Sequence, residues 1–123
     1  MDFTKGRLVM KLVTAIFKPS RLDAVIDALS AVGASGLTVS EVRGYGRQKG
    51  KTEVYRGAEY EVRLLPKVQV DVACPDEAVE RVTEAIIGAA NTGTIGDGKI
   101  FVRGLDSVVR IRTGERDEQA VSG

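Results

Sequence analysis

The chain has no histidine and only one cysteine. The lack of histidine removes the commonest general base and metal ligand from any catalytic scheme. A single cysteine cannot form an internal disulfide, which fits a reducing compartment such as the cytoplasm. Eighteen basic residues stand against seventeen acidic ones, so the net charge of +1 gives no broad electrostatic argument for nucleic-acid binding.

Long hydrophobic runs are also missing. No apolar segment approaches the roughly 20 residues that a membrane-spanning helix needs. The first ten residues, MDFTKGRLVM, have no apolar core of the kind that a secretory signal carries. At 123 residues, the chain is expected to form one domain with a core of moderate size.

The apolar pattern predicts elements in the order βαββαβ. Strands are expected at 11–18, 37–43 and 62–74, with two short ones at 100–103 and 108–112. A first helix is expected to begin at Ser20, with Asp23 at a capping-box spacing, and to end at Gly33. A second helix is expected to begin at Pro75 and Asp76 and to end before a glycine-rich turn at 91–99. This order matches the α+β sandwich called split βαβ or ferredoxin-like.

Two helices can cover only one face of such a sheet. The other face is expected to carry apolar residues from the first strand, namely Leu12, Val13, Ile16 or Phe17. A second copy of the chain is the natural way to bury them, so the pattern favours a homo-oligomer.

All three tyrosines lie in the stretch GYGRQKGKTEVYRGAEY, from Gly44 to Tyr60. Its apolar residues recur at neither the strand period nor the helix period, so it is predicted to be a long exposed loop without a core. Long structureless loops in compact domains are commonly functional. Flexible backbone, basic side chains and phenolic hydroxyls indicate a loop that meets a partner, an anionic ligand or a modifying enzyme.

The turn TGTIGDGK, at residues 92–99, is the first candidate site. Its glycines are expected to leave backbone N–H groups free to converge on an anion, and Lys99 adds a positive charge. The first seven positions of a P-loop match from Gly93 to Lys99, but Ile100 stands where a magnesium-binding hydroxyl is needed. The helix-then-strand order is also the reverse of a P-loop. A plain connecting turn is the alternative.

Two pairs of residues add to this candidate. Arg110 and Arg112 are two apart on an expected strand, so both guanidinium groups would point to one face and, with Lys99, could clamp a triphosphate. A solvated charged face is the alternative. Gln48 in the loop and Lys67 at the start of the third strand could meet a carboxylate, although a surface lysine is the default interpretation.

Several motifs together resemble one family. YRGAEY at 55–60 resembles the tyrosine-modification signature of the PII nitrogen-regulatory proteins (the GlnB/GlnK class), and TGTIGDGKIFV at 92–102 resembles the second signature of that family. GYGRQKG, LPKV at 65–68 and VRIRTGE at 109–115 agree as well. The likeness extends from about Met10 to Glu115.

The resemblance implies a homotrimer of ferredoxin-like subunits with a long exposed loop, the T-loop, at about 45–62. It implies a PII domain at 10–112, a flexible N-terminal extension at 1–9 and a C-terminal tail at 113–123. ATP or ADP would lie in clefts between subunits. The implied nucleotide-binding residues are Thr38, Gly46, Arg47, Gly96, Asp97, Gly98, Lys99, Arg110 and Arg112.

The resemblance also implies further ligands. With ATP bound, Mg²⁺ would be held by the phosphates, by the Gln48 side chain and by 2-oxoglutarate, since Mg²⁺ prefers oxygen ligands and substrate phosphates. The implied 2-oxoglutarate-binding residues are Gln48, Lys49, Gly50 and Lys67. Tyr60 would receive a uridylyl or adenylyl group from a nucleotidylyltransferase.

On this basis the chain is expected to be a cytoplasmic regulator that senses nitrogen, carbon and energy status, and not an enzyme. Its T-loop would act on nitrogen-assimilation targets, such as an ammonium transporter that recruits it to the membrane or the adenylyltransferase of glutamine synthetase.

Three alternatives remain open. One is a nucleotide-binding regulator without covalent modification. Another is a small phosphate hydrolase, with Cys74 before the second helix as its nucleophile. The third is a nucleic-acid-binding module that uses the basic tyrosine loop.

Overall fold

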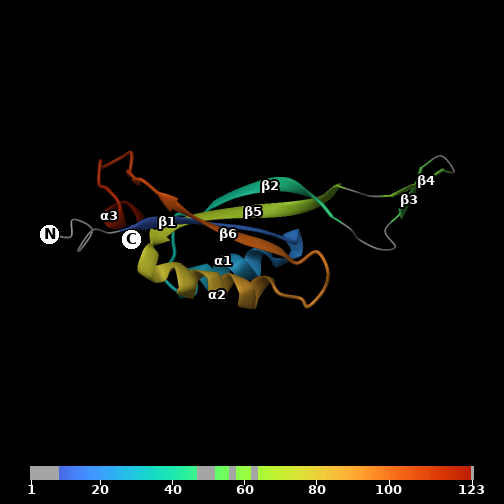
Figure 1. The fold of residues 1–123 in the computed structure, drawn as a ribbon, viewed down its shortest axis with the longest axis horizontal. Helices are drawn as coiled ribbons and strands as arrows, with labels where there is room; N and C mark the ends of the chain where they lie inside the picture. Colours follow the sequence, from blue (N-terminus) through green and yellow to red (C-terminus); the bar gives the residue numbers. More distant parts are fainter. Residues whose placement is uncertain (1–8, 47–51, 56–57, 62–63, 123) are drawn as a thin grey trace.

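The structure, a computed structural model, describes residues 9–46, 52–55, 58–61 and 64–122 (Figure 1). Its strands are β1 (Met10–Phe17), β2 (Thr38–Tyr45), β3 (Thr52–Tyr55), β4 (Ala58–Glu61), β5 (Leu64–Pro75) and β6 (Gly98–Leu105). Its helices are α1 (Leu22–Ala31), α2 (Val79–Ala90) and the single turn α3 (Glu118–Val121). Short 3-10 turns, η1 (Pro19–Arg21) and η2 (Asp76–Ala78), lead into α1 and α2. None of the described helices is long and apolar enough to cross a membrane.

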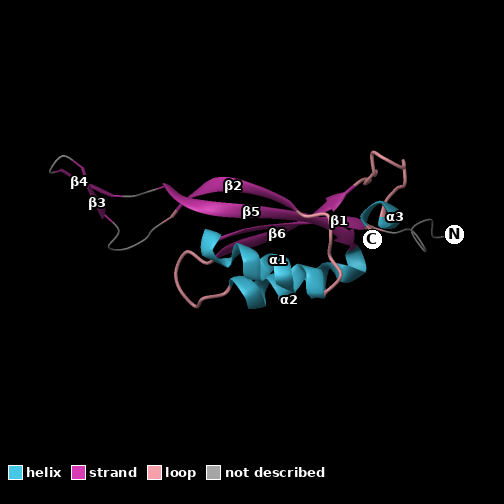
Figure 2. Ribbon diagram, turned by 180° about the vertical axis from the view of Figure 1, so that it is seen from behind, coloured by secondary structure: helices cyan, strands magenta, loops and turns pink. Residues whose placement is uncertain are grey.

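The main sheet has the strand order β2-β5-β1-β6, and each neighbouring pair is antiparallel. Both long helices lie on one face of it (Figure 2). With the β3–β4 hairpin set aside, the elements follow the order βαββαβ, so the predicted ferredoxin-like α+β fold is confirmed.

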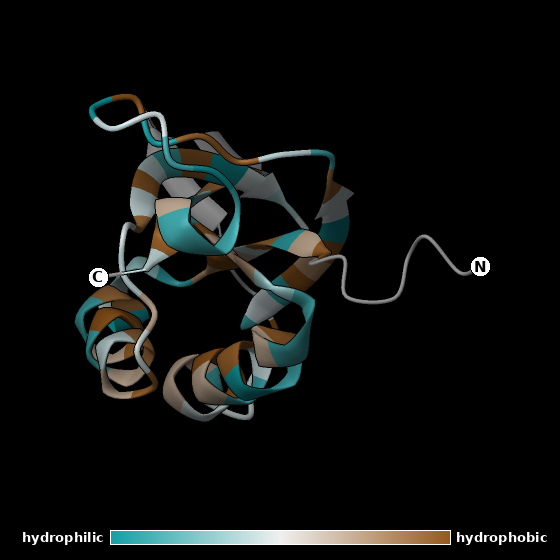
Figure 3. Cartoon of the chain, turned by 90° about the vertical axis from the view of Figure 1, so that its left-hand side faces the viewer, coloured by the Kyte–Doolittle hydropathy of each residue, from teal (hydrophilic) through white to brown (hydrophobic). Residues whose placement is uncertain are grey.

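The core lies between the sheet and the two helices. Alternate residues of the central strands point into it, because successive side chains on a strand face opposite sides. Its buried members are Val13, Ala15, Phe17, Val68, Val70, Val72 and Cys74 from the strands, and Val25, Leu29, Ala78, Val82, Ile86 and Ala90 from the helical segments. Figure 3 shows both helices on the same side of the strands.

This alternation corrects one expectation. Val13 and Phe17 are buried against the helices, so they do not belong to the uncovered face of the sheet. Leu12 and Ile16, which point the other way, are only partly buried. The uncovered face also carries polar groups, since the Thr14 hydroxyl donates to Asp71 Oδ1 at 2.5 Å.

Three local predictions were wrong in detail. Ser20 does not cap α1, because Ser20 lies inside η1 and no side chain caps either segment. The tyrosine loop is not wholly irregular, since β3 and β4 form a hairpin in which Thr52 pairs with Glu61 and Tyr55 with Ala58. Backbone pairing of this kind requires no apolar period, so the sequence pattern did not reveal it.

The third wrong prediction is the strand at 108–112. Only an isolated bridge between Val109 and Arg116 is present, and the chain turns back at Gly114, whose φ is +73°. The Arg110 N–H donates to the Glu115 carbonyl at 2.8 Å, and the Gly114 N–H donates to the Arg110 carbonyl at 2.7 Å. The segment is therefore a tight reversal, and its backbone pairs with the tail that follows.

Candidate functional site

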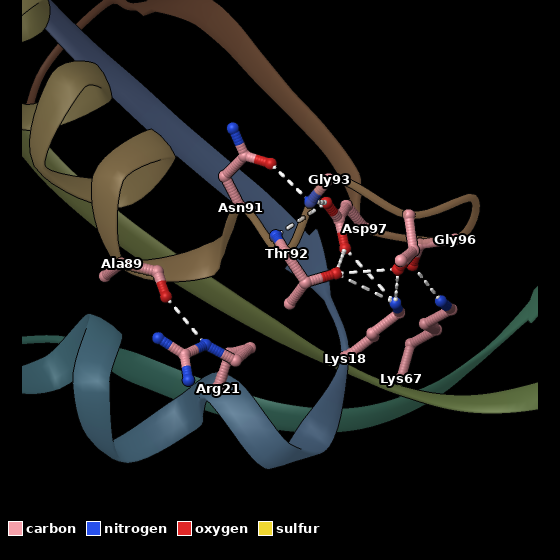
Figure 4. Close-up of polar contacts among 10 residues, drawn as sticks. Lys18, Arg21, Lys67, Ala89, Asn91, Thr92, Gly93, Gly96 and Asp97 are labelled. Carbon is pink, nitrogen blue, oxygen red and sulfur yellow. Dashed lines mark hydrogen bonds and ion pairs between the residues drawn. The ribbon is translucent and has the colours of Figure 1, made fainter.

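The glycine-rich turn after α2 is closed around its own carboxylate (Figure 4). Asp97 Oδ2 accepts the backbone N–H of Thr92 at 2.8 Å and that of Gly93 at 3.0 Å. Its Oδ1 accepts the Thr92 hydroxyl. Asn91 Oδ1 also accepts the Gly93 N–H, at 2.8 Å. The expectation of free N–H groups is therefore wrong for Thr92 and Gly93.

Lys18, directly after β1, supplies the counter-charge to this carboxylate. Its ammonium lies 3.2 Å from Asp97 Oδ1 and donates to the hydroxyls of Thr92, at 3.2 Å, and Thr94. The Thr92 hydroxyl, followed by backbone N–H groups and by Lys18, holds the pKa of Asp97 well below its usual range against a smaller opposing effect of burial. Asp97 therefore remains ionised and fixes the turn.

Lys67 on β5 contacts the same turn from the other side. Its ammonium donates to the Gly96 carbonyl oxygen (Figure 4). Its aliphatic chain lies over Gly44 at the end of β2, where an added Cβ would be 3.2 Å from Lys67 Cγ. The absence of a side chain at position 44 therefore makes room for this lysine.

These contacts bring three distant stretches to the rim of one pocket of about 400 Å³. Its lining residues are Gly44, Tyr45, Gly46, Leu65, Lys67, Ile95, Gly96, Gly98, Lys99, Phe101 and Ile16. Lys67, Lys99 and glycine backbone line it beside apolar side chains, and no Asp or Glu does among the residues that the structure describes. Such a lining suits an anionic ligand that has an apolar part.

Gly98 allows the turn to enter β6 next to β1. Its φ is +106°, and a Cβ built there would lie 1.8 Å from the Ile16 carbonyl oxygen. Only glycine fits this position without a backbone shift.

Arg110 and Arg112 line a second pocket, of about 560 Å³. The other lining residues are Ser35, Gly36, Ala73, Val108, Ala120, Val121 and Ser122. Because 108–112 is not a strand, the prediction that both guanidinium groups point to one strand face was wrong. Arg110 instead pairs with Glu115 Oε1 at 2.9 Å and donates to the Ser122 carbonyl at 2.6 Å.

The two pockets lie at opposite ends of β5. Lys67 belongs to the first pocket and Ala73 to the second. Ala73 is six positions after Lys67 on the strand, which corresponds to about 20 Å. Thr38 pairs with Asp71 and so lies toward the end that carries the arginines. One chain therefore does not bring Lys99 together with Arg110 and Arg112.

Some of the predicted residues are not placed. Arg47, Gln48, Lys49 and Gly50 lie outside the described residues. Tyr60 belongs to β4, where its backbone pairs with that of Glu53. No group of three or more Cys, Asp or Glu side chains that could hold a metal occurs among the described residues.

Two residues of this region were not singled out from the sequence. Lys18 stands at a strand end, and a lone lysine there has no sequence signal that points to a turn 74 positions away. Glu115 follows the turn at Gly114, and its contact with Arg110 depends on a reversal that the Val-Arg-Ile-Arg alternation concealed.

Residues 10–115 match the sequence model of the family described as Nitrogen regulatory protein P-II. The chain belongs to the P-II family. The Nitrogen regulatory protein P-II of Rhizobium etli is 59% identical over 112 residues, which cover 91% of this chain and 100% of that protein. The Nitrogen regulatory protein GlnK of Escherichia coli K12 shows the same identity and coverage.

A solved structure agrees with this assignment. The crystal structure of Arabidopsis thaliana PII bound to citrate matches with a TM-score of 0.75 and 38% identity, over 93% of this chain and 91% of that one. The predicted family is thus confirmed, and with it the interpretation of this P-II chain as a nitrogen regulatory protein and not an enzyme.

Cys74 agrees with that conclusion. Its side chain is 5% exposed in the core at the end of β5. Burial raises the pKa of the Cys74 thiol, and the opposing effect of Arg81 is smaller. A thiol with a raised pKa is a poor nucleophile. In this P-II protein Cys74 is a core residue.

Proposed function

We propose that this P-II protein binds ATP or ADP and, with Mg²⁺ and ATP, 2-oxoglutarate, and that its T-loop reports the bound state to nitrogen-assimilation targets. The observation that carries the proposal is the first pocket. The base of the T-loop (Gly44, Tyr45 and Gly46) forms one wall, the glycine-rich turn forms another, and Lys67 hydrogen bonds across to Gly96. A ligand in this pocket touches both the turn and the loop base.

The nucleotide site is proposed to be shared between copies of the chain. Gly46, Gly96, Gly98 and Lys99 line the first pocket, and Asp97 holds the shape of their turn. Arg47 is proposed to join them at the loop base. Thr38, Arg110 and Arg112 would come from a neighbouring subunit.

The separation of the pockets supports this assembly. About 20 Å of strand lies between the two groups within one chain, so one nucleotide reaches both only if a neighbour supplies the second group. Leu12 and Ile16 on the uncovered sheet face are only partly buried, and a homotrimer would cover them.

For 2-oxoglutarate we propose a site at Lys67, with Gln48, Lys49 and Gly50 of the T-loop beside it. Lys67 and Lys99 give the pocket positive charge, which suits a dicarboxylate. The Arabidopsis relative was solved with citrate, itself a small carboxylate.

The described residues fit a magnesium ion only when the ligands bring oxygen atoms to it. The described part of the pocket is lined by Lys67 and Lys99 and by no Asp or Glu, so it would not attract a bare cation. We therefore propose that ATP phosphates, 2-oxoglutarate and the Gln48 side chain hold Mg²⁺.

The T-loop is proposed to be the segment that contacts the target proteins. Tyr60 on β4 is proposed to receive a uridylyl or adenylyl group from a nucleotidylyltransferase, and a regulator without this modification is the alternative. The proposed targets are an ammonium transporter and the adenylyltransferase of glutamine synthetase. The protein would act in the cytoplasm and be recruited to the membrane by the transporter.

Calorimetric titration tests the ligand part of the proposal. 2-Oxoglutarate should bind to the protein in the presence of Mg²⁺ and ATP, and not with ADP or without nucleotide. Lys67→Gln should abolish this binding. Lys11→Gln is the matched control, because Lys11 pairs with Cys74 at the opposite end of β5 and its ammonium lies 3.8 Å from Asp76, away from the first pocket. Binding of 2-oxoglutarate without any nucleotide, or equal loss in both variants, would contradict the proposal.

A further inference from the structure

The guanidinium of Arg110 is held by the segment that follows it in the chain. Nη1 lies 2.9 Å from Glu115 Oε1, and Nη2 donates to the Ser122 carbonyl oxygen at 2.6 Å. The Arg110 side chain is 27% exposed, so it lies along the protein surface and not free in solvent. Each terminal nitrogen of Arg110 thus has a partner from the tail, namely the Glu115 carboxylate for Nη1 and the Ser122 carbonyl for Nη2.

The tail that supplies these groups is itself well fixed. Asp117 donates its backbone N–H to the Val108 carbonyl at 2.8 Å, and Asp117 Oδ1 accepts the Val108 N–H at 3.1 Å. Val109 bridges to Arg116 in between. These bonds place Glu115 opposite Arg110 across the chain reversal at Gly114.

The same tail forms a wall of the second pocket. Ala120, Val121 and Ser122, from α3 and the residue after it, line that pocket together with Arg110 and Arg112. An anion that enters the pocket to reach Arg110 therefore meets a guanidinium that is already neutralised by Glu115. A charged phosphate is also repelled by that carboxylate at close range.

We propose that Glu115, with the Ser122 carbonyl, is an internal competitor for the anion site at Arg110, and that Glu115 thereby sets the affinity of the second pocket for phosphate groups. The inference rests on the proposed nucleotide function. Beyond that function, the inference gives Glu115 the role of weakening phosphate binding at Arg110 and makes the C-terminal tail part of the anion site. In the bound state Arg110 exchanges Glu115 and Ser122 for phosphate oxygens, and the end of the tail is released.

The pair is partly exposed, which limits its strength. Ion pairs of this kind contribute about 1 kcal/mol or less, so removing the carboxylate should raise phosphate affinity roughly threefold to fivefold. A purely structural pair would leave the affinity unchanged or lower it through a loosened pocket.

The test compares Glu115→Gln with Glu118→Gln by calorimetry at one ionic strength. Glu118 is the matched control, because it removes the same charge from the same tail and its side chain is not among the groups that hold Arg110. ATP and tripolyphosphate should bind more tightly to Glu115→Gln by roughly threefold to fivefold, and to Glu118→Gln by less than about twofold. Adenosine, which has no phosphate, should bind equally to all forms.

Two further measurements locate the effect. Adding Arg110→Gln to the Glu115→Gln variant should remove the gain in tripolyphosphate affinity. In the wild type, tripolyphosphate should accelerate hydrogen exchange at the Ser122 amide, which donates to the Glu118 carbonyl at 3.0 Å.

The outcomes separate the inference from the proposed function. If Glu115→Gln binds phosphate groups no more tightly than Glu118→Gln does, the inference is overturned. The proposed function still stands in that case, provided that the wild type binds ATP. No ATP or ADP binding by the wild type overturns the proposed function, and a gain in tripolyphosphate binding in Glu115→Gln would still support competition at Arg110. Absence of phosphate binding in every form rejects both.

Discussion

Gly98→Ala should be among the most damaging single-methyl changes in this protein. The new Cβ would lie 1.8 Å from the Ile16 carbonyl oxygen, 2.8 Å from its carbon and 2.9 Å from Phe17 Cα. All three atoms belong to backbone, so no side-chain rotation relieves the contact. β6 must move away from β1 by more than about an ångström to restore a normal separation near 3.5 Å.

The cost has two parts. The φ of +106° is strained for any residue with a Cβ, which costs about 1–3 kcal/mol. Separation of β6 from β1 at the Phe17–Gly98 pair also weakens ladder hydrogen bonds, each worth about 1 kcal/mol. Gly98→Ala is therefore expected to lower the free energy of unfolding by about 3–5 kcal/mol.

Gly93→Ala is the matched control in the same turn. Its φ is +76°, and nothing lies within 4 Å of the Cβ that would be added. Only the backbone strain remains, about 1–2 kcal/mol. Urea unfolding at one fixed protein concentration measures both, since the stability of an oligomer depends on concentration. If the two variants differ by less than about 1 kcal/mol, steric exclusion by Ile16 is not what requires glycine at position 98.

Three other predictions concern acid stability, the core thiol and the T-loop. The folded-state pKa of Asp97 is depressed below its ordinary value of 3.8, so the stability that the ionised carboxylate contributes is complete above that pH and is lost as the pH falls toward the folded-state pKa. Asp97→Asn should therefore lose less stability than the wild type over this acid range. Identical acid-unfolding curves for the two proteins would reject this prediction. Cys74 should react with a thiol reagent only as fast as the protein unfolds, because the thiol is buried and its pKa is raised, and rapid labelling of folded protein would contradict this. Intact-mass measurement of protein from nitrogen-starved cells should show one added nucleotidyl group on the wild type and none on Tyr60→Phe; an unshifted wild type under every nitrogen regime rejects the modification.

Much of the fold was predictable because burial leaves a periodic trace in the sequence. The alternation of Val68, Val70 and Val72 marked the two-faced strand β5, and the apolar stripes of both helices marked the faces that pack on it. The segment 108–112 carries the same alternation, yet it forms a reversal. There Gly114 and the backbone of Glu115 offer Arg110 local partners, and sequence period cannot weigh these against a distant strand.

The candidate site was predictable in its parts but not in its arrangement. Glycines, Lys67 and Lys99 could be singled out by chemistry, and the structure brings them to one pocket. The direction in which Asp97 points could not be read from TGTIGDGK, since a carboxylate can face an outside ligand or its own backbone. The separation of Arg110 from Lys99 follows from strand register, which depends on pairings across the whole sheet.

The carboxylate inside the glycine-rich turn has a consequence for how any ligand is received. Asp97, Lys18 and Thr92 shape the turn through contacts within the chain itself. The conformational entropy of this wall is therefore lost during folding, and ordering it does not weaken ligand binding. A wall that is rigid beforehand also changes little when occupied. The structural difference between the empty and the filled pocket is therefore expected on the opposite wall, at Gly44 to Gly46, where the chain leads into the T-loop.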